Sequence, residues 1–314
     1  MKIPGRLQLT FQVVLICLLV WVASSCSIPG ASRLQPEAFV GRIWDSQAEK
    51  FIEKDQFIQK LLRADFVLLG ETHDNPEHHA IELEVLQALL RKEKSPSLVL
   101  EMLDLEDQPE IDRFLQTKST DAAVFNQQTG FAKKGWDWPL YRPLIKTALD
   151  HRLQIVAGNL SHKQLMAVIK NGISDAPQAV RQRLAQSQNL KPDQQLQLMQ
   201  DIRDSHCGKL PEKMVSGMTH SQIARDVMLA EKTAKAGMPV LLIAGSGHVR
   251  RDRGVPFYLS QIVPDARIVS VGMLGVDSNT KPTDLAKQKS LFDYLWYTDS
   301  VEREDPCIGF KLRQ

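Results

Sequence analysis

Histidine and carboxylate side chains follow short apolar runs at three places in this sequence. Gly70-Glu71-Thr72-His73 and Gly245-Ser246-Gly247-His248 are two Gly-x-x-His motifs, and Glu101 follows a third apolar run. Imidazoles and carboxylates can bind a divalent metal ion, and they can also act as general acids and bases. The pattern therefore indicates either metal ligands (His73, Glu101 and His248) or the catalytic residues of a hydrolase (Glu71, His73, Glu101 and His248).

A mainly parallel β-sheet would bring these motifs together. Five short runs rich in Val, Ile and Leu predict strands that are buried on both faces: residues 64–69, 97–100, 154–157, 240–244 and 267–271. Sites in α/β proteins lie beyond the carboxyl ends of such strands. We therefore expect His73, Glu101 and His248 to lie close together at one edge of the sheet.

Helical patterns between the strands complete the predicted fold. Asn75-Pro76 is typical of a helix start, and a helical apolar face follows it: Ala80, Ile81, Leu83, Val85, Leu86, Leu89 and Leu90. A second helix is predicted over 221–236 and ends at Gly237. The polar, Gln-rich stretch of about 161–215 predicts a small inserted helical subdomain, or alternatively a mobile lid. The fold class is α/β, with a mainly parallel sheet flanked by helices and this insertion.

Composition and charge exclude several classes of protein. The 314 residues are 43% hydrophobic and 24% charged, which is typical of a globular chain and not of a disordered one. Lys and Arg number 39 against 37 Asp and Glu, and both excess charges, Lys2 and Arg6, precede residue 26. The remainder is neutral, so we expect no nucleic-acid partner.

The N-terminus has the features of an export signal. Lys2 and Arg6 precede an apolar run over 13–23, which is too short to span a bilayer. Ala23-Ser24-Ser25-Cys26 resembles a bacterial lipobox. We expect a lipoprotein signal peptide (1–25), lipidation of Cys26 and a tether over 26–40, with the lipid anchor in the cell envelope, at the outer membrane. A plain cleaved signal peptide is the alternative.

Two cysteines then remain in an oxidising compartment. Cys207 and Cys307 are far apart in the sequence, and exported cysteines are more often paired than free. We expect a disulfide between them, although sequence cannot supply the geometry that the bond requires.

Further side chains could contribute to a site or to the core. His78 and His79 lie in the first turn of the predicted helix, where one of the two could face the strand ends; a partly exposed pair is an equal alternative. Arg250, Arg251 and Arg253 could hold a carboxylate-bearing ligand, or form a solvated loop. Trp136 and Trp138 could wall a flat apolar ligand, or belong to the core.

The motifs together resemble a known family. Leu68–Asn75 with His78-His79, Glu101-Met102, Trp136–Tyr141, Gln222-x-x-Arg225-Asp226, Gly245–His248 and Glu304–Cys307 are similar to the ChaN-type haem-binding uptake lipoproteins, which share a superfamily with Tiki, TraB and erythromycin esterase proteins. The resemblance covers 41–314, and it implies a parallel sheet flanked by helices with a small helical domain. In the Tiki branch it implies a metal-dependent protease site at His73, Glu101 and His248.

In the ChaN branch, the resemblance implies haem as cofactor, a haem-dependent homodimer and an outer-membrane haem or iron receptor as partner. The axial ligand stays open among Tyr141, Tyr258, Tyr294, Tyr297, His78, His79 and His248, with Arg250 and Arg251 for the propionates. The expected function is therefore haem binding for iron uptake. A metal-dependent hydrolase, with a divalent metal at the two Gly-x-x-His motifs, is the alternative.

Overall fold

Eight strands form one sheet in the computed structural model, which describes residues 36–305, 307 and 308. The five predicted strands are present, and they pair in parallel with one another. They are β3 (Phe66–Glu71), β4 (Ser97–Asp104), β5 (Ile155–Asn159), β6 (Val240–Gly245) and β7 (Ile268–Val276). The predicted fold class is confirmed.

The sequence analysis missed the other edge of the sheet. β1 (Ile43–Asp45) and β2 (Lys50–Ile52) have three residues each, and β8 (Tyr294–Asp299) has three aromatic residues but only one aliphatic residue. β8 pairs in parallel with β7, whereas β1 pairs antiparallel with β2 and β8. The strand order is β2-β1-β8-β7-β3-β6-β4-β5, so β6 separates β3 from β4.

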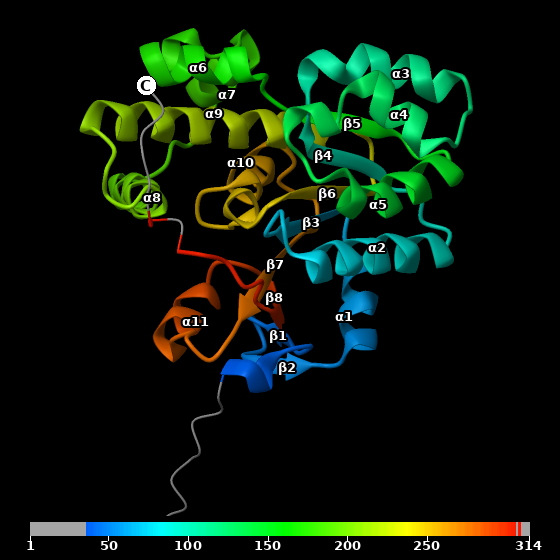
Figure 1. Ribbon diagram of the computed structural model, residues 1–314, viewed down its shortest axis with the longest axis horizontal. Helices are drawn as coiled ribbons and strands as arrows, with labels where there is room; N and C mark the ends of the chain where they lie inside the picture. Colours follow the sequence, from blue (N-terminus) through cyan, green and yellow to red (C-terminus); the bar gives the residue numbers. More distant parts are fainter. Residues whose placement is uncertain (1–35, 306, 309–314) are drawn as a thin grey trace, which may run out of the picture. The chain divides into compact units, whose positions relative to one another are not determined.

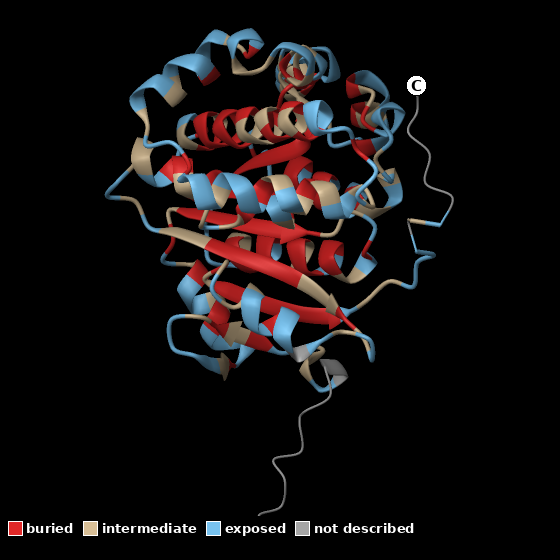
Figure 2. Cartoon of the chain, turned by 90° about the vertical axis from the view of Figure 1, so that its left-hand side faces the viewer, coloured by how far each residue is buried: buried red, intermediate tan, exposed pale blue. Residues whose placement is uncertain are grey.

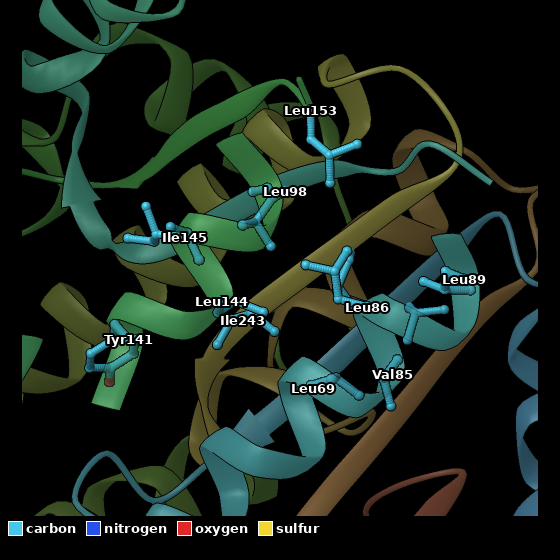
Figure 3. Close-up of a cluster of buried hydrophobic side chains, with 14 of the residues drawn as sticks. Leu69, Val85, Leu86, Leu89, Leu98, Tyr141, Leu144, Ile145, Leu153 and Ile243 are labelled. Carbon is cyan, nitrogen blue, oxygen red and sulfur yellow. The ribbon is translucent and has the colours of Figure 1, made fainter. Parts of the chain in front are cut away.

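Helices cover both faces of the sheet (Figure 1). Alternate residues of β3 show why, because Val67 and Leu69 belong to one apolar core and Phe66 and Leu68 to another. The first core includes α1 (Lys54–Leu61), α2 (Pro76–Arg91), α3 (Gln108–Gln116), α4 (Ala122–Thr129) and α5 (Trp138–Asp150). The second includes α9 (Glu212–Lys235), α10 (Val255–Ile262) and α11 (Pro282–Gln288). Figure 2 shows the buried strands between helices with exposed outer sides, and Figure 3 shows part of the first core.

Helix α2 begins as predicted, but its buried face differs from the prediction. The Asn75 side chain accepts hydrogen bonds from the backbone N–H groups of Glu77 (2.9 Å) and His78 (3.4 Å). Ala80 is exposed, whereas the carboxyl-bearing Glu82 is fully buried. The prediction counted only apolar residues, and it therefore made no assignment for Glu82.

Helices fill the region predicted as a helical insertion. They are α6 (His162–Asn171), α7 (Gln178–Gln186), α8 (Pro192–Ser205) and the start of α9. Helix α9 begins at Glu212, nine residues before the predicted start at 221. A small separate core, which includes Leu198, Ile202 and Val215, joins α8 to α9.

The ends of the chain lie partly outside the described residues. The signal peptide and Cys26 are outside them. The packed structure starts before the predicted boundary at residue 41, because the Phe39 ring lies 5.5 Å from that of Tyr297. Cys207 and Cys307 form a disulfide with their Cα atoms 5.6 Å apart. No helix in the described part of the chain is both long enough and apolar enough to cross a membrane.

Candidate functional site

The carboxyl ends of β3, β6 and β4 lie side by side and bring the predicted site residues together. The chain order reverses here, since β3 has β6 on one side and β7 on the other. Glu71 ends β3, Glu101 lies in β4, and His248 lies in the short turn Ser246–Val249 after β6. The expectation that residues from all three strands converge is confirmed. They do not form one cluster, however, but two.

The first group is the β3–α2 cluster: Glu71, His73, His79, Glu82 and Tyr141. Glu71 Oε1 accepts hydrogen bonds from Tyr141 Oη (2.6 Å) and from His73 Nδ1 (2.7 Å). His79 Nδ1 lies 3.1 Å from Glu71 Oε2 and 3.1 Å from Glu82 Oε2. Only His73 reaches solvent, with 40% of its side chain exposed, while Glu71 and Glu82 are completely buried.

Burial and proximity separate the pKa values of the two carboxyls in the β3–α2 cluster. Burial alone would raise the pKa of Glu71, but its contacts with His73, Glu82 and His79 outweigh it and lower that pKa. Burial and the neighbouring charge of Glu71 raise the pKa of Glu82 well above its usual value. Glu71 therefore ionises before Glu82, because two buried carboxylates in contact cannot both ionise cheaply.

The second group is the β4–β6 cluster: Glu101, Arg225, Asp226 and His248. His248 Nδ1 donates to Asp226 Oδ1 (2.5 Å), and its Nε2 lies 3.2 Å from Glu101 Oε1. Arg225 lies 3.5 Å from the same Glu101 oxygen, and the Gly245 N–H donates to Glu101 Oε2 (2.8 Å). Burial lowers the pKa of His248, but the carboxylates of Glu101 and Asp226 more than compensate and raise it to about 9.

The three residues of the predicted metal set lie near one another, but Glu101 and His248 contact each other while His73 contacts Glu71. Burial would raise the pKa of Glu101, but the charges of His248 and Arg225 outweigh it and lower that pKa. A metal ligand must be a neutral imidazole, so a metal ion at these residues would have to displace the proton that the two carboxylates favour on His248. Glu101 and His248 also act electrostatically on His73, with opposite effects on its pKa.

A surface pocket of about 480 Å³ lies over both clusters. His73 forms part of its wall, and its ring lies edge-on to that of Trp136, with centroids 4.9 Å apart. A Cβ atom placed on Gly245 would lie 3.0 Å from His73 Nε2 and 3.6 Å from Glu101 Oε2. Glycine at 245 therefore keeps open the space between His73 and the β4–β6 cluster. Leu198, Ile202 and Phe292 supply the apolar part of the pocket wall.

The four tyrosines proposed as haem ligands are all interior. Tyr141, Tyr258 and Tyr297 are at most 1% exposed, and Tyr294 is 9% exposed. Burial raises the pKa of each phenol, to about 12 for Tyr297. The Tyr141 hydroxyl also donates a hydrogen bond to Glu71, and Figure 3 places its ring among core residues of α5. None of the four is placed to meet a ligand at the surface.

The histidine pair after Asn75 is buried rather than partly exposed, which corrects that alternative. His78 Nδ1 accepts from the Thr72 N–H (2.8 Å), so its Nε2–H donates to Thr298 Oγ1 (2.9 Å). Burial lowers the pKa of His78 to about 4, which keeps the ring neutral. His78 has no nitrogen left for haem, and His79 and His248 are held inside their clusters.

The predicted cations are already paired. Arg250 lines the pocket and contacts Asp252 (2.6 Å) and Asp201 (3.2 Å). Arg251 pairs with Asp293 (3.1 Å) and lines a different pocket. Arg253 is buried against Asp201. Arg250 is thus the member of the predicted propionate pair that faces the pocket.

Sequence reasoning gave no site role to Glu82, Arg225 or Asp226, and it named Tyr141 only as a candidate haem ligand. Glu82 lies three residues after His79, so both lie on one helix face; a carboxylate within an apolar helical period was the available signal. Asp226 lies on the buried face of α9 and orients His248. The contact between Tyr141 and Glu71 joins α5 to β3 and leaves no local pattern in the sequence.

Comparisons with known proteins agree with this architecture. The sequence model of the family described as haem-binding uptake, Tiki superfamily, ChaN matches residues 57–259, which is more than half of the chain. The chain therefore belongs to this family. A structure of ChaN of Campylobacter jejuni with cofacial haem binding has a TM-score of 0.66 and 23% identity, over 81% of this chain and 95% of that one.

More distant structures share less. A Bacillus cereus protein has a TM-score of 0.41 and 14% identity, over 71% of this chain and 68% of that one. A succinoglycan biosynthesis protein has a TM-score of 0.40 and 15% identity, over 77% and 74%. A search of the curated proteins found no match.

Proposed function

We propose that this chain is an exported, lipid-anchored protein that binds haem and takes part in haem or iron uptake. Its membership of the ChaN family carries the proposal. The lipobox at Ala23–Cys26 supports the anchor, at the outer membrane. An outer-membrane haem or iron receptor is the proposed partner.

The pocket at the strand ends offers several of the groups that haem requires. Haem needs an apolar wall, a nitrogen or oxygen ligand for iron and cations for its propionates. Leu198, Ile202 and Phe292 supply apolar surface. Arg250 supplies a cation, and to bind a propionate it would have to release its ion pair with Asp201 or Asp252. His73 is the exposed histidine of the pocket, and its Nδ1–H is held by Glu71, which leaves Nε2 as the available nitrogen. Iron would supply the ligation chemistry, and Glu71 would orient the ring.

A haem titration of the purified chain, followed by absorbance, tests this function. We expect a saturable Soret shift that His73→Ala weakens strongly and that His151→Ala, on the exposed end of α5, does not change. A haem-dependent increase in hydrodynamic size would support the proposed homodimer, because a surface-open pocket can be closed by a second copy. No saturable shift at micromolar haem would refute haem binding.

The anchor is tested separately. Cys26→Ser removes the acylated thiol, so we expect the variant to be exported but recovered in the soluble fraction. A variant that stays in the membrane fraction after a high-salt wash would contradict lipidation at this residue.

One observation favours hydrolysis as a second candidate function. The pair Glu71–His73 has the geometry of a carboxylate that orients a general base, with His73 Nε2 at the pocket above Gly245. In this mechanism His73 would take a proton from water, while Glu71 would stabilise the resulting imidazolium. Hydrolysis of model peptides or esters that His73→Ala abolishes would support it; equal rates for wild type and variant would exclude it.

A further inference from the structure

The buried end of the β3–α2 cluster has the composition of a metal site. Among the residues that the structure describes, Glu71, His79 and Glu82 are the group whose candidate ligand atoms all lie within 4.8 Å of one another. Glu71 comes from the end of β3, and His79 and Glu82 come from one face of α2. Glu71 of this group contacts His73, but the group shares no residue with the predicted metal set of His73, Glu101 and His248.

Two carboxylate oxygens in this group lack hydrogen-bond partners. They are Glu71 Oε2 and Glu82 Oε1, and both residues are almost completely buried. A buried polar atom without a partner is costly, and it calls for an unseen partner. Glu71 Oε2 lies 3.1 Å from His79 Nδ1 and so points into the group.

The orientation of the His79 ring is fixed on its far side. Its Nε2 lies 3.0 Å from the backbone carbonyl of His73, which can only accept, so Nε2 donates a hydrogen bond there. Nδ1 is then the nitrogen that faces the two carboxyl groups and could bind a metal ion. This is the arrangement of metal-binding histidines, whose second nitrogen usually donates to a carbonyl or a carboxylate. On the other side, Glu71 Oε1 is held by Tyr141 and His73, which orients the carboxylate.

Charge and spacing point to a small divalent cation. When the three groups bind a metal ion, they do so as two carboxylates and one neutral imidazole, with two negative charges that one divalent ion balances. Ligand atoms at about 2.0–2.1 Å from a tetrahedral ion lie roughly 3.3 Å apart. The 3.1 Å separations from His79 Nδ1 to both carboxylates are close to that value.

We propose that Glu71, His79 and Glu82 bind one divalent cation of the zinc class. Binding requires two carboxylates and a neutral imidazole, so any proton that the three groups hold is released to solvent when the ion binds. The site is structural, because its ligands join α2 to the end of β3 and because the cluster is closed to solvent. It also fixes Glu71, whose other oxygen holds His73.

The test is zinc binding by the purified, tag-free chain, measured by elemental analysis after gel filtration. We expect about one ion per chain in the wild type. Glu82→Gln keeps the shape of the side chain and removes one ligand charge, and it should weaken zinc binding by about 100-fold or more. The matched control is Glu84→Gln on the same helix. Glu84 is half-buried and pairs with Lys54 rather than with the three proposed ligands, so this variant should leave zinc binding unchanged.

A third variant separates this site from the strand ends. Glu101→Gln should retain the ion, because Glu101 is not among the three ligands. Loss of the ion in Glu101→Gln with retention in Glu82→Gln would overturn the proposal and place the metal at the strand ends. No bound zinc in the wild type would overturn it as well.

A measurement on the wild type alone covers the case in which Glu82→Gln fails to fold. X-ray absorption of the zinc-loaded chain reports how many imidazoles bind the ion. One imidazole with oxygen ligands supports Glu71, His79 and Glu82, whereas two imidazoles would refute this set.

Discussion

The two histidine–carboxylate clusters use similar residues but differ in how completely they are neutralised. In the β4–β6 cluster, two carboxylates face one imidazolium and one guanidinium, and both nitrogens of His248 lie against a carboxylate. In the β3–α2 cluster, two buried carboxyl groups face the single nitrogen Nδ1 of His79, and one oxygen of each lacks a partner. The charges of the first cluster balance one another. The second cluster needs a proton or a cation to balance its carboxylates.

The difference has a physical consequence for the role of each region. A buried ion pair with matched charges is destabilised strongly when one partner is removed. A carboxyl that is already protonated tolerates replacement by its amide. We therefore regard the β4–β6 cluster as a rigid support for the pocket and the β3–α2 cluster as the region that can accept a ligand.

The largest expected effect is on the β4–β6 cluster. His248→Leu leaves Glu101 and Asp226 buried without their shared cation, and it should lower the free energy of unfolding by about 3–5 kcal/mol. Urea denaturation followed by circular dichroism measures this. The matched control is His151→Leu on the surface, which should change stability by less than about 0.5 kcal/mol. Equal effects of the two variants would mean that the cluster is not held by His248.

The same cluster should make stability fall in alkali. The folded-state pKa of His248 is raised to about 9, above the ordinary value of 6.5. The stabilisation that protonated His248 gives to the folded state is therefore complete below about pH 6.5 and is lost as pH rises through 9. The free energy of unfolding should fall over this range by a total of the order of 3 kcal/mol. NMR titration of the His248 ring should give a midpoint near the upper value. A midpoint at or below 6.5 would show that the two carboxylates do not hold the proton.

A smaller effect is expected where the two clusters meet. Gly245→Ala would place a methyl group 3.0 Å from His73 Nε2. Because the His73 ring is partly exposed and can rotate, the cost in stability should be about 1 kcal/mol. The displaced ring should change the fluorescence of Trp136, which it contacts. Gly247→Ala is the control, since its methyl group would have no neighbour within 4 Å; identical spectra for the two variants would contradict the placement of His73.

The smallest effect is expected for Glu82→Gln in metal-free protein. Burial beside Glu71 raises the pKa of Glu82 and so favours its neutral form, which the amide of Gln resembles. The change in unfolding free energy should stay within about 1 kcal/mol. Glu101→Gln in the β4–β6 cluster should cost more, because it removes an ionised partner of His248. If Glu82→Gln lowered the free energy of unfolding more than Glu101→Gln, the roles assigned to the two clusters would be wrong.

Much of the fold could be predicted from periodicity. The five aliphatic runs became strands because Val, Ile and Leu there are buried on both faces of a parallel sheet. Asn75-Pro76 set the start of α2 through a local cap, which depends on neighbouring residues alone. The short strands β1 and β2 could not be found this way, since three residues are too few to establish a period.

The sequence predicted which edge of the sheet carries the site, but not which side chains pair there. The two Gly-x-x-His motifs and Glu101 were correctly assigned to one edge of the sheet. Whether Glu101 meets His73 or His248 depends on β6 lying between β3 and β4, and no local pattern encodes that order. The same limit applies to the tyrosines, because residue type does not reveal that all four phenols are interior.

The sequence by itself determined which side chains stand at the ends of the strands, because a strand and the motif after it are adjacent along the chain. The tertiary structure decided how those side chains pair. Partners such as Glu71 with Tyr141, and His248 with Asp226, come from elements that packing alone brings together. Pairing then fixes the charge on each group, since burial makes ionisation depend on the nearest opposite charge.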